Sequence, residues 1–340
     1  MKKFLIILLS IVMLTGFYGC GEKTIEIEKI TFGFTPKTSQ IEVQEFSRNF
    51  GNDLKSLLAE TGYIVNEVEV VFTSSNEALC QDIENGTIDL GFISPVGFLE
   101  SEQPHLKPLL VSDTLDCILH DDSLEKINDD REAIEVGKAP GYYGFIYVNT
   151  GFPAGEEIYR KAIEKKLRWN DISGLRWNVG SPVSLDTYMM PSLWLNNSFG
   201  RGLTSDRKTV AELEDVEGYM GYYDMMYNLI TGNCDVMVAY ADMRREIRFD
   251  EVIYETWGSE YSEMYDFIKI IGVTPMIYND IIIYNEKNMN AKMSKAVSKA
   301  LVKIAEPDDS YLRRINIYGF ENISTGDLKH MREMVELFNN

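Results

Sequence analysis

Short runs of apolar residues alternate with amphipathic segments over the first third of the chain. Residues 29–34 form an apolar-rich run typical of a strand, residues 41–61 repeat their apolar positions at helical spacing, and residues 67–72 alternate as a second strand does. A capping pattern at residues 74–77 predicts the start of another helix, and a buried strand is predicted from Leu90. This order of strands and helices predicts an α/β unit.

One phrase occurs twice in the pattern. Residues 84–93 read Glu-Asn-Gly-Thr-Ile-Asp-Leu-Gly-Phe-Ile, and residues 230–239 read Ile-Thr-Gly-Asn-Cys-Asp-Val-Met-Val-Ala. Each copy follows a predicted helix, places Gly86 or Gly232 where a helix end favours a left-handed residue, and then enters a short apolar run. The chain therefore looks built from two similar α/β lobes, and small molecules bind between such units.

The pattern after the first lobe predicts a second lobe and then a return. We assign residues 28–148 and 270–340 to lobe one and residues 149–269 to lobe two. Two segments then cross between the lobes and form a hinge that can open and close. The later predicted elements are a strand at 144–148, a helix at 154–166, a strand at 177–180, a helix at 187–196, strands within 268–284 interrupted by Pro275, and helices at 291–304 and 325–338.

The first 19 residues are typical of a secretory signal, because two lysines precede an apolar stretch at residues 4–18 that is short for a membrane span. Gly19-Cys20 resembles the bacterial lipoprotein processing site, although Phe17 stands where that pattern usually has Leu. We expect lipidation of Cys20, a tether at residues 20–27, and a protein held at the outer face of the bacterial cytoplasmic membrane. The alternatives are an ordinary membrane anchor or a signal without lipidation.

The formal net charge of the chain is -20. Nucleic acid is disfavoured as a partner, since phosphate backbones need clustered Lys and Arg. Much of the excess acid lies in residues 113–135, for which we expect a solvated surface helix or loop. A calcium site is the sharper alternative, but the spacing of these acids does not match a calcium-binding loop.

Three cysteines remain beyond Cys20, namely Cys80, Cys117 and Cys234. A chain of this length can bury an adequate core without disulfides, so we expect buried free thiols. A disulfide between two of the three stays open as an alternative.

Catalysis finds little support in the sequence. The three histidines, His105, His120 and His330, lack metal-ligand spacing, and nucleophile motifs, phosphate loops and zinc signatures are absent from the sequence. We therefore expect no enzyme activity, metal or cofactor. Cys234 is the one side chain to consider as a nucleophile, and its place at the base of a predicted strand favours a core position.

Five segments in order resemble the substrate-binding proteins of phosphate, phosphite and phosphonate ABC importers. The resemblance implies a two-lobed periplasmic-binding-protein type II fold, with a small ligand held in the interlobe cleft. It also implies delivery to an ABC permease powered by a cytoplasmic ATPase. The segments are residues 30–36, 85–98, 141–148, 180–191 and 274–280.

Departures from the family pattern bear on the ligand. The family's anion loop reads Ser-Thr-Ser-Gly, whereas the matching residues here are Ser184-Leu185-Asp186-Thr187. A carboxylate repels an anion, so Asp186 is expected either to cap a helix or to indicate a different ligand. An acidic position of the family corresponds to Tyr240, and its histidine region corresponds to residues 222–224.

These departures favour a cationic or ring-bearing ligand over a simple phosphonate, because aromatic faces attract cations. An oxyanion ligand stays open. A lipoprotein sensor or adhesin with the same fold, without transport, is the alternative function. The predicted ligand-binding residues are Thr35, Lys37, Ser94 and Phe98 from lobe one and Ser184, Asp186, Tyr222 and Tyr240 from lobe two.

Overall fold

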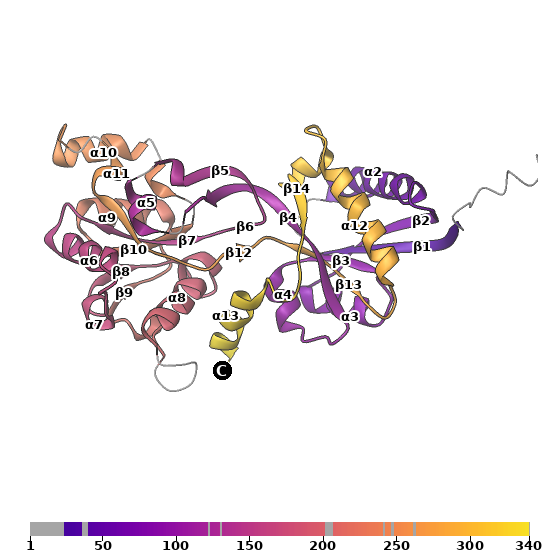
Figure 1. Ribbon diagram of the computed structural model, residues 1–340, viewed down its shortest axis with the longest axis horizontal. Coiled ribbons are helices and arrows are strands. Elements are labelled where there is room, and N and C mark those ends of the chain that lie inside the picture. The colour runs from indigo at the N-terminus through magenta and orange to yellow at the C-terminus, as the bar shows by residue number, and fades with distance from the viewer. Residues whose placement is uncertain are drawn as a thin grey trace, which may run out of the picture.

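Two α/β lobes lie side by side in the computed structural model, joined by strands that run between them (Figure 1). The structure describes residues 24–35, 40–121, 123–129, 131–200, 207–240, 242–245, 248–260 and 263–339. The predicted signal, Cys20 and Lys37 lie outside these residues. None of the helices in these ranges is long and apolar enough to span a membrane.

Lobe one is built on a sheet whose strands follow the order β14-β4-β13-β3-β1-β2, with β5 paired to β4. The strands β1, β2 and β3 are parallel, and β13 and β14 run antiparallel to their neighbours. The predicted strand, helix, strand, helix, strand order of this lobe is confirmed. The strands are β1 Ile25–Phe34, β2 Tyr63–Phe72, β3 Leu90–Ile93, β4 Leu106–Leu119, β5 Ile134–Ala139, β13 Ile281–Asn285 and β14 Gly319–Asn322.

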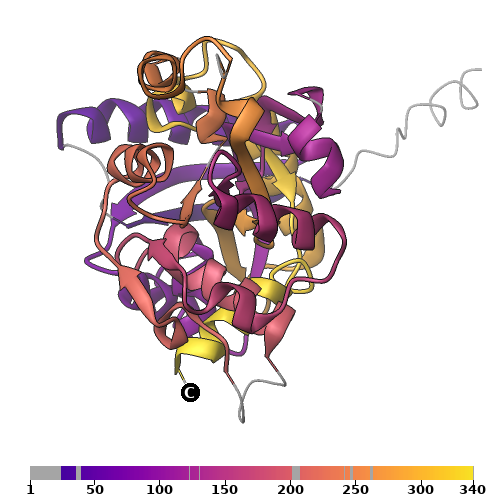
Figure 2. The ribbon, with the colours of Figure 1, turned by 90° about the vertical axis from the view of Figure 1, so that its left-hand side faces the viewer.

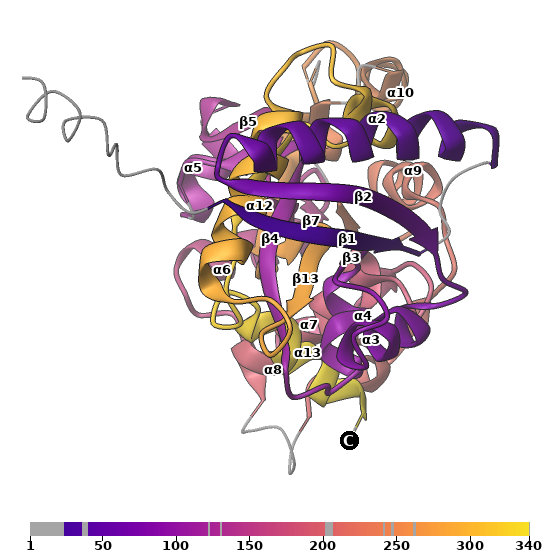
Figure 3. The same cartoon turned by 90° about the vertical axis from the view of Figure 1, so that its right-hand side faces the viewer.

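Helices cover both faces of the lobe-one sheet. Phe32 packs with Leu54 of α2 and Val297 of α12 on one face, and Leu79 of α3 packs with Phe98 of α4 on the other. Figure 3 shows α2 along β1 and β2, with α3 and α4 on the opposite side. The helices are α2 Gln40–Ala59, α3 Asn76–Glu84, α4 Pro95–Glu100, α12 Ala291–Ala305 and α13 Lys329–Asn339, with a 3-10 turn at Tyr311–Ile315.

Lobe two is built on a sheet of order β11-β7-β10-β8-β9. Every residue of the interior strand β7 is buried, because Phe145 and Tyr147 pack against α9 and Ile146 and Val148 pack against α6 and α8. Figure 2 views the molecule from this end. The elements are β7 Gly144–Asn149, β8 Arg176–Asn178, β9 Asp215–Glu217, β10 Val236–Tyr240, β11 Ile268–Val273, α5 Leu124–Asp129, α6 Pro153–Ile163, α7 Trp169–Ile172, α8 Met190–Phe199, α9 Tyr222–Thr231, α10 Arg248–Trp257 and α11 Met264–Phe267, with short turns at Arg131–Ala133, Leu185–Met189, Val210–Glu212 and Met243–Arg245.

The repeated phrase has the same structure in both lobes. Gly86 and Gly232 adopt positive φ values of 78° and 76° at the ends of α3 and α9, as predicted. The Asp that follows accepts a backbone N–H of the neighbouring parallel strand, at 2.8 Å between Asp89 and Thr31 and at 2.9 Å between Asp235 and Arg176. The phrase thus ends a helix, turns the chain and fixes the next strand beside its neighbour.

The lobe boundaries differ from the predicted ones. Lobe one was predicted to end at residue 148 and to resume at residue 270, but β7 and β11 pair with each other in the lobe-two sheet. Apolar composition does not reveal which sheet a buried strand joins, since only long-range pairing decides it. The crossings lie instead at the antiparallel pair of β6 Gly141–Tyr142 and β12 Ile277–Tyr278, and the β4–β5 ribbon adds a further link.

The C-terminal helix α13 also connects the lobes. It contacts α4 of lobe one and α8 of lobe two, and Met334 lies in one apolar cluster with Phe98 and Leu193. Arg207 of lobe two donates to the carbonyl of Leu337 at 3.2 Å. This helix lies between the lobes in Figure 1.

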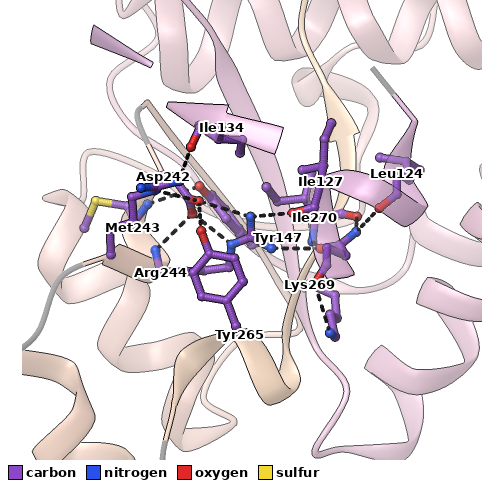
Figure 4. A network of polar contacts seen from close by, with 12 residues as sticks. Leu124, Ile127, Ile134, Tyr147, Asp242, Met243, Arg244, Tyr265, Lys269 and Ile270 are labelled. Carbon is purple, nitrogen blue, oxygen red and sulfur yellow. Dashed lines mark hydrogen bonds and ion pairs between the residues drawn. The ribbon is translucent and has the colours of Figure 1, made fainter. Parts of the chain in front are cut away.

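A buried ion pair organises the part of lobe two that follows the end of β10 (Figure 4). The side chains of Asp242 and Arg244 are fully buried, with Nε and Oδ1 2.8 Å apart. Arg244 also donates to Asn128 Oδ1 at 2.9 Å, and Asn128 in turn accepts from and donates to the backbone of Ile270. Tyr265 donates its hydroxyl to Asp242. The network ties α5 to the edge of β11 and satisfies each buried charge.

Arg244→Met should lower the free energy of unfolding by about 3–5 kcal/mol, because it leaves the Asp242 carboxylate buried without its cation. Urea unfolding followed by circular dichroism measures this change. Arg160→Met is the matched control, since Arg160 pairs with Glu157 and Glu164 at the surface. The control should leave the stability nearly unchanged, and an equal effect of the two substitutions would contradict the role assigned to the buried pair.

Candidate functional site

Asp186 lies at the start of lobe two's π-helical turn Leu185–Met189, next to the beginning of β7. It is only 7% exposed. Its Oδ1 accepts the hydroxyl of Ser184 at 2.6 Å, its Oδ2 accepts the hydroxyl of Tyr222, and Thr187 donates to Ser184 at 2.7 Å. Gly144 leaves the space for this turn, because a Cβ there would lie 2.6 Å from the backbone oxygen of Asp186.

Asp186 does not cap a helix, which was one of its two predicted roles. Its carboxylate accepts from side-chain hydroxyls and not from the backbone N–H groups of the first turn. Within the described ranges, no Lys, Arg or His forms an ion pair with it. The remaining predicted role, contact with a ligand that is not an anion, stays a prediction.

Three tyrosine rings lie together beside Asp186. The ring centroids of Tyr222 and Tyr240 are 4.9 Å apart, and those of Tyr142 and Tyr240 are 6.1 Å apart. The structure thus brings together Tyr222, Tyr240, Ser184 and Asp186, which were predicted as the lobe-two contribution. Tyr142 was missed, because its position on the two-residue strand β6 carries no periodic signal.

The charges around these rings are negative. Burial and then the charge of Asp186 raise the pKa of Tyr142 well above its usual range, and Asp116 and Asp280 add to this effect. Burial and then the hydrogen bond to Asp186 raise the pKa of Tyr222 likewise. Both hydroxyls therefore stay protonated, and each can donate a hydrogen bond.

The predicted lobe-one residues have different surroundings. Ser94 is the N-cap of α4, where its Oγ accepts the backbone N–H of Gly97 at 3.2 Å and the amide of Asn76 at 3.1 Å. Phe98 is 7% exposed and belongs to the apolar cluster that Tyr142 borders, so it is a core residue of lobe one. Thr35 is half-buried at the end of β1.

The acidic segment at residues 113–135 is not a solvated helix or loop as a whole. Its first part belongs to β4 and its last part to β5, and these two strands form the antiparallel ribbon between the lobes. Long strands were missed here because charged residues interrupt the apolar alternation. Across the described ranges, no group of three or more His, Cys, Asp or Glu is placed to hold a metal ion.

The three cysteines of the described chain are buried and free, as expected. Burial raises the pKa of Cys234 to about 12, so this thiol stays protonated and packs in the core beside Met225. The predicted core position of Cys234 is thereby confirmed.

A hollow of about 880 Å³ lies beside the edge strand β11, and its lining includes none of the predicted ligand residues. Its walls come from the end of β4, from α8 and from the segment that leads to β12. The residues along it include His120, Tyr143, Trp194 and His330.

A family model described as the periplasmic substrate-binding protein of a phosphonate ABC transporter matches residues 32–328. The chain belongs to this family. The predicted resemblance and the predicted type II binding-protein fold are thereby confirmed. A search of curated proteins found no significant match.

Solved structures of similar fold include other members of such transport systems. The Mycoplasma hyorhinis protein Mh-p37, proposed to transport thiamine pyrophosphate, has a TM-score of 0.56 at 14% identity, over 92% of this chain and 99% of that one. A binding component of an ABC phosphonate transporter from Pseudomonas aeruginosa has a TM-score of 0.41 at 14% identity, over 92% and 89%. The methylphosphonate complex of PhnD1 from Prochlorococcus marinus has a TM-score of 0.40 at 13% identity, over 92% of this chain and 98% of that one. At 14% identity, the similarity to Mh-p37 shows the fold alone.

Membership in this family establishes the general role of the chain. It is an extracytoplasmic solute-binding component of an ABC transporter, with a small-molecule ligand and a permease and ATPase as partners. The family consists of transport components and not of enzymes.

Asp113, on β4, is a buried carboxyl group that the site does not use. It is 6% exposed, and its Oδ1 has no hydrogen-bond partner within the described structure. Burial first, and the nearby charge of Glu321 second, raise its pKa from 3.8 to about 6, against the opposing effect of Lys138. The folded protein therefore keeps this proton up to about pH 6, whereas the unfolded chain releases it near 3.8.

Because the folded state binds the extra proton, this group lowers stability as the pH rises from about 4 to about 6. Asp113→Asn should raise the free energy of unfolding by roughly 1 to 3 kcal/mol at about pH 7.5 and have little effect at about pH 4. Urea unfolding at both pH values measures the difference. Asp309→Asn, in an exposed loop, is the control, and an equal gain in both variants would rule out the burial effect.

Proposed function

We propose that this chain is a lipid-anchored solute-binding protein of an ABC importer whose ligand is cationic or ring-bearing instead of a simple phosphonate. The observation that carries the ligand class is the buried carboxylate of Asp186, surrounded by tyrosine rings and held by two hydroxyl donors. Its position in the turn that leads into α8 corresponds to the loop expected to hold the anion of a phosphonate.

A phosphonate at this position would meet a like charge. Two unit charges a few ångströms apart in a partly dry site repel by on the order of several kcal/mol. A ligand with a positive charge gains the same interaction with opposite sign, and aromatic faces add roughly 0.5 to 2 kcal/mol for each contact. The electrostatics at Asp186 therefore favour a cation.

Capture requires that the ligand stabilise the closed arrangement of the lobes. A ligand shifts this equilibrium only by the difference between its affinities for the closed and open states, so it must contact both lobes. Lobe two would contribute Ser184, Asp186, Tyr222 and Tyr240. Lobe one would contribute Thr35, Lys37 and Ser94, while the core position of Phe98 limits it to supporting the site from behind.

Lipidation of Cys20 would keep the protein at the outer face of the cytoplasmic membrane, next to its permease. The proposal rests on the signal pattern of residues 1–19 and on the extracytoplasmic role of the family. A lipoprotein sensor or adhesin with the same fold remains the second candidate, and its distinguishing property is a cleft that binds no small molecule.

A thermal-shift screen tests the ligand class. The detergent-purified chain is heated with methylphosphonate, phosphite, phosphate, thiamine and its phosphates, nucleosides, and quaternary amines. A tight ligand at saturation should stabilise the protein by about 3 to 4 kcal/mol, which is a readily visible shift. A shift with phosphonate or phosphite alone would overturn the proposed ligand class, and no shift with any compound would favour the sensor or adhesin.

Cys20→Ser should release the protein from the membrane or leave its signal uncleaved, because the thiol that would carry the lipid is lost. Membrane fractionation and incorporation of labelled fatty acid, in the unmodified chain and in the variant, measure this. Equal label in the two proteins would exclude Cys20 as the lipidation site.

A further inference from the structure

We propose that Tyr142, Tyr222 and Tyr240 form with Asp186 a recognition site for an organic ammonium cation, in which Asp186 supplies the charge preference and Tyr142 of the hinge strand β6 supplies a ring. The inference rests on the proposed function and narrows it, from a cationic or ring-bearing ligand to one recognised by its positive charge. It also adds to the site a residue from the segment on which the lobes move.

The three rings pack edge to face and not as a stack. The planes of Tyr222 and Tyr240 meet at 62°, and those of Tyr142 and Tyr240 meet at 80°. The three ring planes are therefore steeply inclined to one another, and the rings contact each other edge to face. Such faces carry the negative side of the aromatic quadrupole and attract an ammonium group within about 6 Å of a ring centre. Aromatic cages that recognise quaternary ammonium groups use the same physics.

The charge of Asp186 has no cation to balance it in the described parts of the chain. The hydroxyls of Ser184 and Tyr222 stabilise the carboxylate through hydrogen bonds, but they do not cancel its charge. Asp186 is only 7% exposed, and a buried charge without a counter-ion raises the free energy of the folded protein. A cationic ligand supplies the counter-ion, so its binding is favoured over that of a neutral molecule of the same shape.

A second carboxylate strengthens the field at the hinge. Asp116 lies half-buried on β4, where its Oδ1 accepts its neighbouring backbone N–H from Cys117 at 2.7 Å. Its charge acts on the hydroxyl of Tyr142 together with that of Asp186. The pKa of Tyr142 is therefore raised by carboxylates from two parts of the chain, one on the ribbon between the lobes and one in lobe two.

The tyrosine side chains are more exposed to solvent than the carboxylate that they surround. Tyr240 is 38% exposed, Tyr142 and Tyr222 are half-buried, and Asp186 is 7% exposed. The carboxylate is thus less exposed than the rings beside it. An oxyanion is repelled by the ring faces and by the carboxylate, whereas an ammonium group is attracted by both.

Calorimetric titration with a charged and uncharged pair of compounds tests the inference. Choline and its neutral isostere 3,3-dimethylbutan-1-ol have nearly the same shape, and methylphosphonate represents the anionic class. The detergent-purified chain should bind choline at least about tenfold more tightly than the neutral isostere, and should not bind methylphosphonate.

Three substitutions separate the contributions of charge and ring. Asp186→Asn should remove most of the tenfold preference, because it removes the charge and keeps the shape. Tyr142→Phe keeps the ring and should keep the preference, whereas Tyr142→Leu should weaken choline binding by about tenfold. Tyr240→Leu repeats this test at a more exposed ring if Tyr142→Leu does not fold. Asp215→Asn, on the exposed strand β9, controls for the general charge of lobe two.

The outcomes are distinct for this inference and for the proposed function. Equal binding of choline and its isostere, or an unchanged preference in Asp186→Asn, overturns the inference. Binding of a neutral ring compound or of methylphosphonate in preference to choline also overturns it, while a solute-binding function stands. Absence of binding by every compound of the pair and of the wider screen counts against both.

Discussion

The strands that link the two sheets are the constraint on which the rest of the structure depends. The chain passes from lobe one through β4 and β5, enters lobe two through β6 and β7, and returns through β12. This path places the ends of β7, β10 and β11 at one edge of the lobe-two sheet, beside the hinge. Asp186 and Tyr240 lie at that edge because the turn before α8 packs on Gly144 and because β10 ends there.

Packed helices also connect the two lobes, in addition to the linking strands. One apolar cluster runs from α4 of lobe one through α13 to α8 of lobe two, and Tyr142 and Leu185 border it. Movement of the lobes must therefore rearrange packed side chains as well as backbone angles. Interfaces of this kind favour discrete arrangements over continuous bending, which suits a protein that captures and releases a ligand.

Much of the fold could be predicted from the sequence because its signals are local. The repeated phrase encodes a helix end, a left-handed glycine and a strand within ten residues, and its Asp makes the same backbone contact in both lobes. The membership of β7 in the second sheet could not be predicted, because it depends on pairing with β11 more than a hundred residues later. The acidic ribbon was missed for a related reason, since its strands are specified by each other and not by apolar alternation.

Part of the candidate site could be predicted from the sequence. The residues that could be predicted follow recognisable helices and turns, and the one that could not depends on long-range strand pairing. Side chains in the turn before α8 and at the start of α9 were found because they follow recognisable elements, whereas Tyr142 emerges only when the hinge strands are placed in space. Burial and the charges of Asp186 and Asp116 raise the pKa of Tyr142, so its hydroxyl remains protonated. A buried carboxylate without a counter-ion lowers the stability of the folded chain, and under the proposed function a positively charged ligand would offset this cost.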